Sequence, residues 1–251
     1  MKVMSIRIGM IVGFVALWQL ASGRIIDDYF VSSPSAILAD LRAGFSDGQL
    51  LSDIATTMYE AGLGLTFGMV SGIVVGLVFA FMPLVDKVME PIVGALNAVP
   101  RPALAPLFVL WFGLGMTSKV LVAWSLVFFV AFYNAYQGVK SIDQDVVNSV
   151  RVMKADRLQM LKIVVLPAVF TWVFAAFKLS VGYALVGAII GEFVGATSGL
   201  GYQLVQAQGL LNTDRVFSIV ILTGIVATII LFVAGRLEKA LVKWRPQATM
   251  G

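Results

Sequence analysis

The sequence of 251 residues contains no cysteine and no histidine. Their absence excludes thiol and imidazole catalysis, a Ser-His-Asp triad and the usual zinc sites. A G-x-x-x-x-G-K-[ST] loop is also missing, so the chain lacks this device for binding nucleotide phosphates. We therefore expect no catalytic residue, no metal ligand and no cofactor-binding residue in this chain.

Charged residues are scarce as well. They make up 13% of the sequence, whereas 59% of the residues are hydrophobic. A soluble domain has about 25% charged residues, and so few charges do not cover a globular surface. The basic residues alternate with acids and flank apolar runs, which argues against nucleic-acid binding. The composition predicts an all-α membrane protein.

Six apolar runs approach the roughly 20 residues that a membrane-spanning helix needs. The expected spans lie near residues 8–22, 61–85, 91–113, 120–139, 164–191 and 216–235, within one domain that covers residues 1–251. The first run resembles the core of a signal peptide, but Arg24, Asp27 and Asp28 follow it without a clear cleavage site. We interpret it as a retained first span.

The placement of lysine and arginine predicts the orientation, because cytoplasmic segments carry an excess of these residues. With the N-terminus inside, twelve basic residues fall in cytoplasmic segments and four fall outside. The inside set is Lys2, Arg7, Lys87, Lys140, Arg151, Lys154, Arg157, Lys162, Arg236, Lys239, Lys243 and Arg245, and the outside set is Arg24, Arg42, Lys119 and Arg215. Both termini are therefore predicted to lie in the cytoplasm.

Residues 140–163 form a charged, helix-prone segment between the fourth and fifth spans, on the predicted cytoplasmic side. Val147, Val150 and Met153 recur at nearly helical spacing, and Leu158 and Leu161 do the same. Two short helices with an apolar side are expected here. A loop that only sets topology would not need that side, so it is expected to bind either lipid headgroups or a partner protein.

The same segment resembles the cytoplasmic coupling loop of ABC importer permeases, the EAA loop. The family pattern is Glu-Ala-Ala, three residues, Gly, nine residues, Ile, one residue and Leu-Pro. Leu166-Pro167 matches directly, Val164 stands at the Ile, and Lys154 replaces the Gly. The coupling residues implied by this match are Asn148, Ser149, Val150, Lys154, Ala155, Asp156, Leu158, Leu161, Leu166 and Pro167. We expect Asp156 to cap the second short helix.

Two further stretches resemble the nitrate, sulfonate and taurine branch of this family. They are NAVPRPALAPLFVLWFGLGMTSK at residues 97–119 and GEFVGATSGLGYQL at residues 191–204. The resemblance implies the type I importer fold in a bacterial inner membrane and a homodimer of the permease. It also implies two cytoplasmic ATPase subunits that hold ATP and Mg, and a periplasmic substrate-binding protein. The implied cargo is a small solute, with an organic or inorganic anion expected.

A second group of residues is expected to line a pathway or a gate: Asn97, Pro100, Arg101, Pro102, Asn134, Lys178 and Glu192. The prolines interrupt the third span, and backbone groups freed by proline need partners inside protein or water. A charge at membrane depth costs on the order of 3 kcal/mol and usually has a partner or faces a cavity.

Each polar residue of this group has two interpretations that the sequence leaves open. Arg101 either lines the pathway or forms an ion pair with Glu60 or Glu192. Lys178 either holds the structure together or contacts the cargo. Glu192 either holds an outer gate or pairs with Arg215, and Asn134 either lines the path or bonds a neighbouring helix.

The main alternative function is a secondary transporter driven by an ion gradient, with a buried acid such as Glu192 as the proton carrier. It would operate without an ATPase subunit. A separate feature, the ladder Gly64, Gly68, Gly72 and Gly76 in the second span, predicts close helix packing. We favour packing within the chain over a dimer interface.

Overall fold

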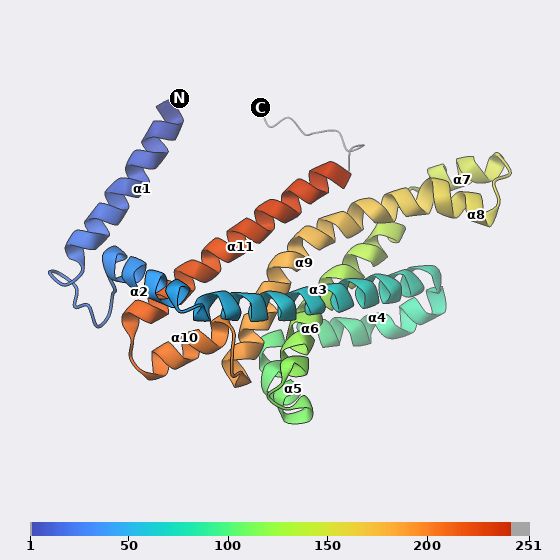
Figure 1. The fold of residues 1–251 in the computed structure, drawn as a ribbon. Helices are drawn as coiled ribbons and strands as arrows, with labels where there is room; N and C mark the ends of the chain where they lie inside the picture. The colour runs from blue at the N-terminus through green and yellow to red at the C-terminus, as the bar shows by residue number, and fades with distance from the viewer. Residues whose placement is uncertain (1, 242–251) are drawn as a thin grey trace.

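A computed structural model describes residues 2–241, and these residues form helices connected by short turns (Figure 1). The order is α1 (Lys2–Ala21), α2 (Pro34–Ser46), α3 (Gln49–Phe81), α4 (Pro83–Ala98), the 3-10 turn η1 (Arg101–Leu104), α5 (Ala105–Phe112), α6 (Met116–Lys140), α7 (Gln144–Val152), α8 (Arg157–Met160), the π-helical turn η2 (Leu161–Val165), α9 (Leu166–Gly195), α10 (Leu200–Gly209) and α11 (Thr213–Leu241). Lys243 and Arg245, part of the predicted inside set, lie outside the described residues.

Five helices are long and apolar enough to cross a membrane, and a bent pair makes up to six. The five are α1, α3, α6, α11 and the continuous helix Leu158–Gly195. The bent pair is the third span in chain order, and it differs from the expected single helix at 91–113 because α4 and the helix Arg101–Phe112 meet at an angle of 85°. Proline at positions 100 and 102 removes two backbone donors at this break.

The expected span boundaries also shift at both ends of several helices. α3 begins at Gln49, twelve residues before the expected start, and is 33 residues long, or about 50 Å at helical rise. A bilayer core is about 30 Å thick, so α3 extends beyond it. The segment between the expected fifth and sixth spans contains the ten-residue helix α10. α2 starts as its sequence predicts, with Ser33 capping the helix and Pro34 following in the first turn.

The core of the bundle lies where α3, α6 and α9 pack together. The four glycines of the α3 ladder all face α6, where a methyl group would collide with the neighbouring helix. A Cβ built on Gly72 would lie 2.5 Å from the carbonyl oxygen of Phe128, for example. The ladder therefore serves packing within the chain, as favoured from the sequence.

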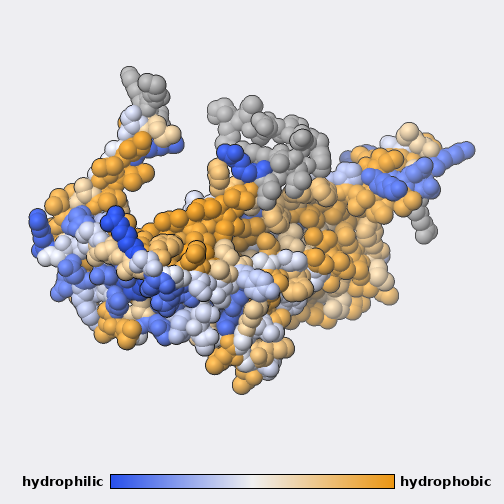
Figure 2. Space-filling model, viewed as in Figure 1, coloured by the Kyte–Doolittle hydropathy of each residue, from blue (hydrophilic) through white to orange (hydrophobic). Residues whose placement is uncertain are grey.

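The polar ends of the bundle separate as a membrane protein requires. Figure 2 shows a hydrophobic belt across the long helices, with hydrophilic surface over α2 and α10 at one end and over α7 and α8 at the other. The segments predicted to lie outside meet at the α2 end, where Thr213 donates a hydrogen bond to the carbonyl oxygen of Tyr29 at 2.7 Å.

Candidate functional site

The predicted coupling loop forms two short helices joined by a tight turn. Asp143 caps α7 by accepting a hydrogen bond from the amide of Asp145 at 2.8 Å. At its other end, the amide of Lys154 donates to the Arg151 carbonyl at 2.9 Å and the amide of Ala155 donates to the Val150 carbonyl at 3.3 Å. This pair of bonds is a Schellman motif. Lys154 has φ +59°, so it takes the left-handed conformation that the family's glycine adopts without strain.

The second helix begins at a capping box. The Asp156 Oδ1 atom accepts a hydrogen bond from the amide of Gln159 at 2.7 Å, and Gln159 Oε1 accepts one from the amide of Asp156 at 2.9 Å. The cap expected at Asp156 is therefore present, and Gln159, which the sequence analysis did not single out, completes it.

The second helix runs without interruption into the fifth span. α8, the π-helical turn η2 and α9 follow one another directly, so residues 158–195 form one helix. Pro167 lies in the first turn of α9 and has no backbone N–H to donate. The π-helical turn η2, where the hydrogen-bond register shifts, lies directly before it. The loop is thus fixed to the membrane bundle through a continuous helix, whereas the sequence had placed the start of the span at residue 164.

The tip of the loop exposes apolar side chains. Val152 is 82% exposed and Met153 is 80% exposed, and Leu158 on α8 is exposed as well. Val147 and Val150 are half-buried, and Asn148 and Ser149 are exposed on α7. A concavity of about 640 Å³ lies behind the tip and is bounded by residues that include Phe81, Ala155, Asp156, Leu161 and Val165. The loop thus places exposed apolar side chains beside a concavity.

Arg101 lies at the 85° break of the bent third span, against the middle of helix α6. Its Nη1 donates to the Leu96 carbonyl at 2.6 Å, its Nη2 donates to Asn97 Oδ1 at 3.1 Å, and its guanidinium lies 3.9 Å from the centroid of the Phe129 ring. Neither Glu60 nor Glu192 pairs with it, so the ion pair considered from the sequence is absent among the described residues. Arg101 is held as a buried cation by neutral oxygens and an aromatic ring.

The remaining predicted pathway residues lie on different faces. Lys178 is on the exposed side of α9, and Asn134 donates within α6 to the Val130 carbonyl at 2.8 Å. Pro100 and Pro102 lie at the 85° break. The structure therefore brings Asn97, Pro100, Arg101 and Pro102 together and leaves the other members of the group apart from them.

Glu192 belongs to a buried network at the outer end of the bundle. It is 1% exposed, accepts a hydrogen bond from the Thr57 hydroxyl at 2.6 Å, and accepts another from the amide of Gly201 at 2.6 Å. The Thr57 oxygen in turn accepts from the amide of Leu200 at 2.9 Å. Glu192 thereby connects α9, α3 and α10.

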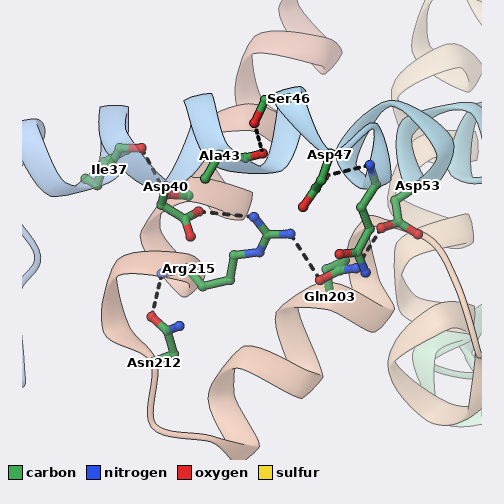
Figure 3. A network of polar contacts seen from close by, with 11 residues as sticks. Ile37, Asp40, Ala43, Ser46, Asp47, Asp53, Gln203, Asn212 and Arg215 are labelled. Atoms are coloured by element: carbon green, nitrogen blue, oxygen red, sulfur yellow. Dashed lines mark hydrogen bonds and ion pairs between the residues drawn. The ribbon is translucent and has the colours of Figure 1, made fainter.

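Of the two interpretations considered for Glu192, the pair with Arg215 is not found among the described residues, where Arg215 has other partners. Its Nη1 lies 3.3 Å from Asp40 Oδ2 and its Nη2 lies 3.3 Å from Gln203 Oε1, as Figure 3 shows. Gln203 continues the network by donating to Asp53 Oδ2 at 2.7 Å. These contacts join α2, α3, α10 and α11 into one outer cap.

Two further polar groups, at Asp53 and Asp86, were not predicted from the sequence. Asp53 also accepts a hydrogen bond from the amide of Gly199 at 2.7 Å, a contact across 146 residues that no local pattern signals. At the opposite end, Asp86 on α4 pairs with Lys140 at 2.8 Å. For Asp86, the signal available in the sequence was its helical spacing to Glu90 in a charged segment. No cluster of potential metal ligands occurs among the described residues.

Comparison with known proteins places this geometry in a family. Residues 68–245 match the family described as "Binding-protein-dependent transport system inner membrane component". The putative aliphatic sulfonates transport permease protein SsuC of Bacillus subtilis is 28% identical over 92% of this chain and 84% of its own length. The taurine transport system permease protein TauC of Escherichia coli is 29% identical over 90% of this chain and 84% of its own length.

A solved structure shares the fold. An inward-facing structure of the MetNI methionine ABC transporter contains a chain that superposes with a TM-score of 0.67 at 17% identity, over 78% of this chain and 98% of that one. The arrangement of apolar spans around a protruding pair of helices is thus the type I importer fold. This chain belongs to the binding-protein-dependent inner membrane component family and is the transmembrane permease subunit of an ABC importer.

Proposed function

We propose that two copies of this chain form the pathway of a bacterial inner-membrane importer. Each copy docks one cytoplasmic ATPase subunit on α7 and α8, and a periplasmic binding protein delivers the solute at the outer cap. ATP and Mg are bound by the ATPase subunits. The family match and the likeness to the SsuC and TauC permeases support this assembly.

The observation that carries the proposal is the coupling loop. Its exposed apolar tip at Val152 and Met153 needs a protein surface to cover it, and the second helix passes rigidly into α9. When the ATPase pair closes on ATP, a displacement of α8 becomes a displacement of the fifth span. Asn148, Ser149, Lys154 and Asp156 fix the shape and the polar rim of this surface.

The proposed cargo is a small anion such as a sulfonate, a taurine-like solute or nitrate. Arg101 supports this choice, since it is a buried cation at the helix break whose hydrogen bonds go only to neutral oxygens in the described structure. The relatives named for aliphatic sulfonates and taurine support it too, although others are named for riboflavin and formylaminopyrimidine. Lys178 is a second candidate contact from α9.

The alternative, a proton-driven transporter that uses Glu192, finds less support in the geometry. Both oxygens of the Glu192 carboxyl group bond to α3 and α10, and the side chain is 1% exposed. A carboxyl group in this position fixes three helices and has no open route to water, whereas a proton carrier needs access to both sides of the membrane in turn.

Reconstitution tests the proposal. The chain is purified with a tag from its native membrane, co-purifying ATPase activity is measured, and the complex is placed in liposomes with its binding protein. Uptake of radiolabelled taurine or an alkanesulfonate is expected to require ATP and to persist with a protonophore. Uptake by the purified chain alone, driven by a proton gradient, would refute it.

The cargo is tested separately with Arg101→Gln and Arg101→Lys. Glutamine removes the charge, so anion uptake is expected to fall strongly. Lysine retains the charge but loses the planar stack on Phe129, so this variant is expected to retain part of the anion uptake. Equal uptake by the wild type and the Gln variant would exclude a role for this cation in the pathway.

A further inference from the structure

We propose that Asp86, Tyr136 and Lys140 form a latch that ties the half-helix α4 to the start of the coupling loop. These three are positioning residues for coupled transport, and they provide a second mechanical connection beside the continuous helix α8–η2–α9. The inference rests on the proposed function, in which the ATPase subunits displace the loop.

The latch is a compact set of contacts between α4 and α6. Lys140 Nζ lies 2.8 Å from Asp86 Oδ2, and the Tyr136 hydroxyl donates to the same oxygen at 3.1 Å. The Lys140 ammonium also lies 5.3 Å from the centroid of the Tyr136 ring. The lysine side chain is 39% exposed and the aspartate side chain 14% exposed, so the pair is reachable by water and can open.

Lys140 lies where a movement of the coupling loop would displace it. It is the last residue of α6, and only residues 141–143 separate it from α7. The amide of Ser141 still donates to the Gln137 carbonyl at 2.8 Å, so the helix continues to the very start of the loop. A displacement of α7 therefore acts directly on the Lys140 ammonium.

The half-helix α4 is built to move as a unit. None of its 16 residues is buried in the chain, and a single non-helical residue, Met82, connects it to α3. Its other end is the 85° break, where Arg101 bonds to Leu96 and Asn97. Between two such hinges, the latch is the ion pair that holds α4 to α6 among the described residues.

Space for the movement lies directly behind the latch. A cavity of about 150 Å³ is bounded by Phe79, Glu90, Val93, Phe132 and Gln137, with Asp86 and Tyr136 at its edge. Phe79 meets Phe132 edge-on at 5.2 Å, and this contact forms the cavity's inner wall. Asp86, Glu90 and Val93 of α4 line one wall of this cavity, so opening of the latch would move that wall.

The free energy of the latch contacts is small enough for a reversible switch. A partly exposed ion pair contributes up to about 1 kcal/mol, which biases an equilibrium up to about fivefold. A contact of this size favours one arrangement without locking it, and energy from the ATPase can reverse it.

A reversible bridge tests the latch in the assembled complex. The chain has no cysteine, so Asp86→Cys with Lys140→Cys introduces the only thiols in the permease. A short bis-methanethiosulfonate should link them and lower ATP-driven uptake at least about tenfold relative to the unlinked protein. Reductant should restore the unlinked rate, and a monofunctional reagent should not block. Uptake at the same rate in linked and unlinked protein would overturn the latch.

Variants that remove the charges of Asp86 and Lys140 test the latch independently. Asp86→Asn and Lys140→Gln are expected to lower solute transported per ATP hydrolysed by about two- to fivefold, with the KM for loaded binding protein unchanged. Exchanging the charges, Asp86→Lys with Lys140→Asp, should recover part of the loss. The neighbouring exposed residue provides the control, because Lys87→Gln should retain the wild-type ratio.

The outcomes separate the two proposals. Wild-type protein that shows no ATP-dependent uptake overturns the proposed function. Wild-type protein that is coupled, with Asp86→Asn and Lys87→Gln giving the same transport per ATP, overturns the latch alone.

Discussion

Lys154 holds a left-handed backbone conformation that a side chain disfavours, and replacing it with glycine tests how the coupling loop keeps its shape. Its φ is +59°, at the position where the two Schellman hydrogen bonds end α7. The family pattern has glycine at this site. We predict that Lys154→Gly stabilises the turn and leaves its geometry unchanged.

The magnitude follows from two opposing contributions. The left-handed conformation costs a residue with a Cβ roughly 1–2 kcal/mol, and glycine removes this cost. Glycine loses more conformational freedom on folding, and this loss reduces the stabilisation by about 0.5–1 kcal/mol. Removing a cation from the end of α7 costs a few tenths of a kcal/mol more. The midpoints of these ranges leave a net stabilisation of the turn of about 0.5 kcal/mol relative to lysine, a roughly twofold shift in its opening equilibrium. Relative to alanine, which loses the same charge, the stabilisation is about 0.5–1 kcal/mol, a two- to fivefold shift.

Hydrogen exchange of the loop amides, read by mass spectrometry in nanodiscs, measures that equilibrium. Peptides that contain residues 150–156 should exchange about two- to fivefold more slowly in Lys154→Gly than in Lys154→Ala. The alanine variant is the matched control, because it loses the same charge but retains the Cβ. Equal exchange in the two variants, or faster exchange in the glycine variant, would refute the assignment of strain to this residue.

Two further predictions concern stability, each with a control on the same helix. Gly72→Ala should destabilise the α3–α6 contact by about 1–3 kcal/mol, since its Cβ would lie 2.5 Å from a carbonyl oxygen, while Gly62→Ala meets open space and should not, as thermal unfolding in detergent will show. Thr57→Ala should cost about 2 kcal/mol, because it leaves the buried amide of Leu200 and an oxygen of Glu192 unsatisfied. Thr56→Ala removes only a bond within the helix to Ser52, so an equal loss in both threonine variants would contradict the network.

Much of the bundle could be predicted from sequence, because apolar length and proline position act locally. Five of the apolar runs fall on helices long enough to cross a membrane and the remaining run falls on the bent pair, whose interruption Pro100 and Pro102 marked. The coupling helices could be predicted as well, since Asp156 and the apolar spacing of the loop are local signals. Lys154 was noted as a departure from the family pattern, but only the backbone shows that the turn survives it.

The parts that escaped prediction depend on contacts between distant residues. The expected spans 61–85 and 91–113 left Asp86 and Glu90 between them, yet both residues lie on α4, where Lys140 satisfies Asp86 from 54 residues away. The contact of Glu192 with Thr57 was not predicted for the same reason, because Thr57 lies 135 residues from it. The start of the fifth span was placed too late, since the π-helical turn accommodates Pro167 without ending the helix.

The central claim is that energy reaches this permease through the exposed tip of the α7–α8 loop. Replacing Val152 and Met153, both at least 80% exposed, by aspartate places two charges on that tip without disturbing buried packing. The most direct measurement is the ATPase subunit retained by the tagged, folded permease in detergent. We expect loss of the ATPase in the aspartate variant and its retention when both residues are leucine. Full retention of the ATPase, with ATP-driven uptake intact in the aspartate variant, would contradict it.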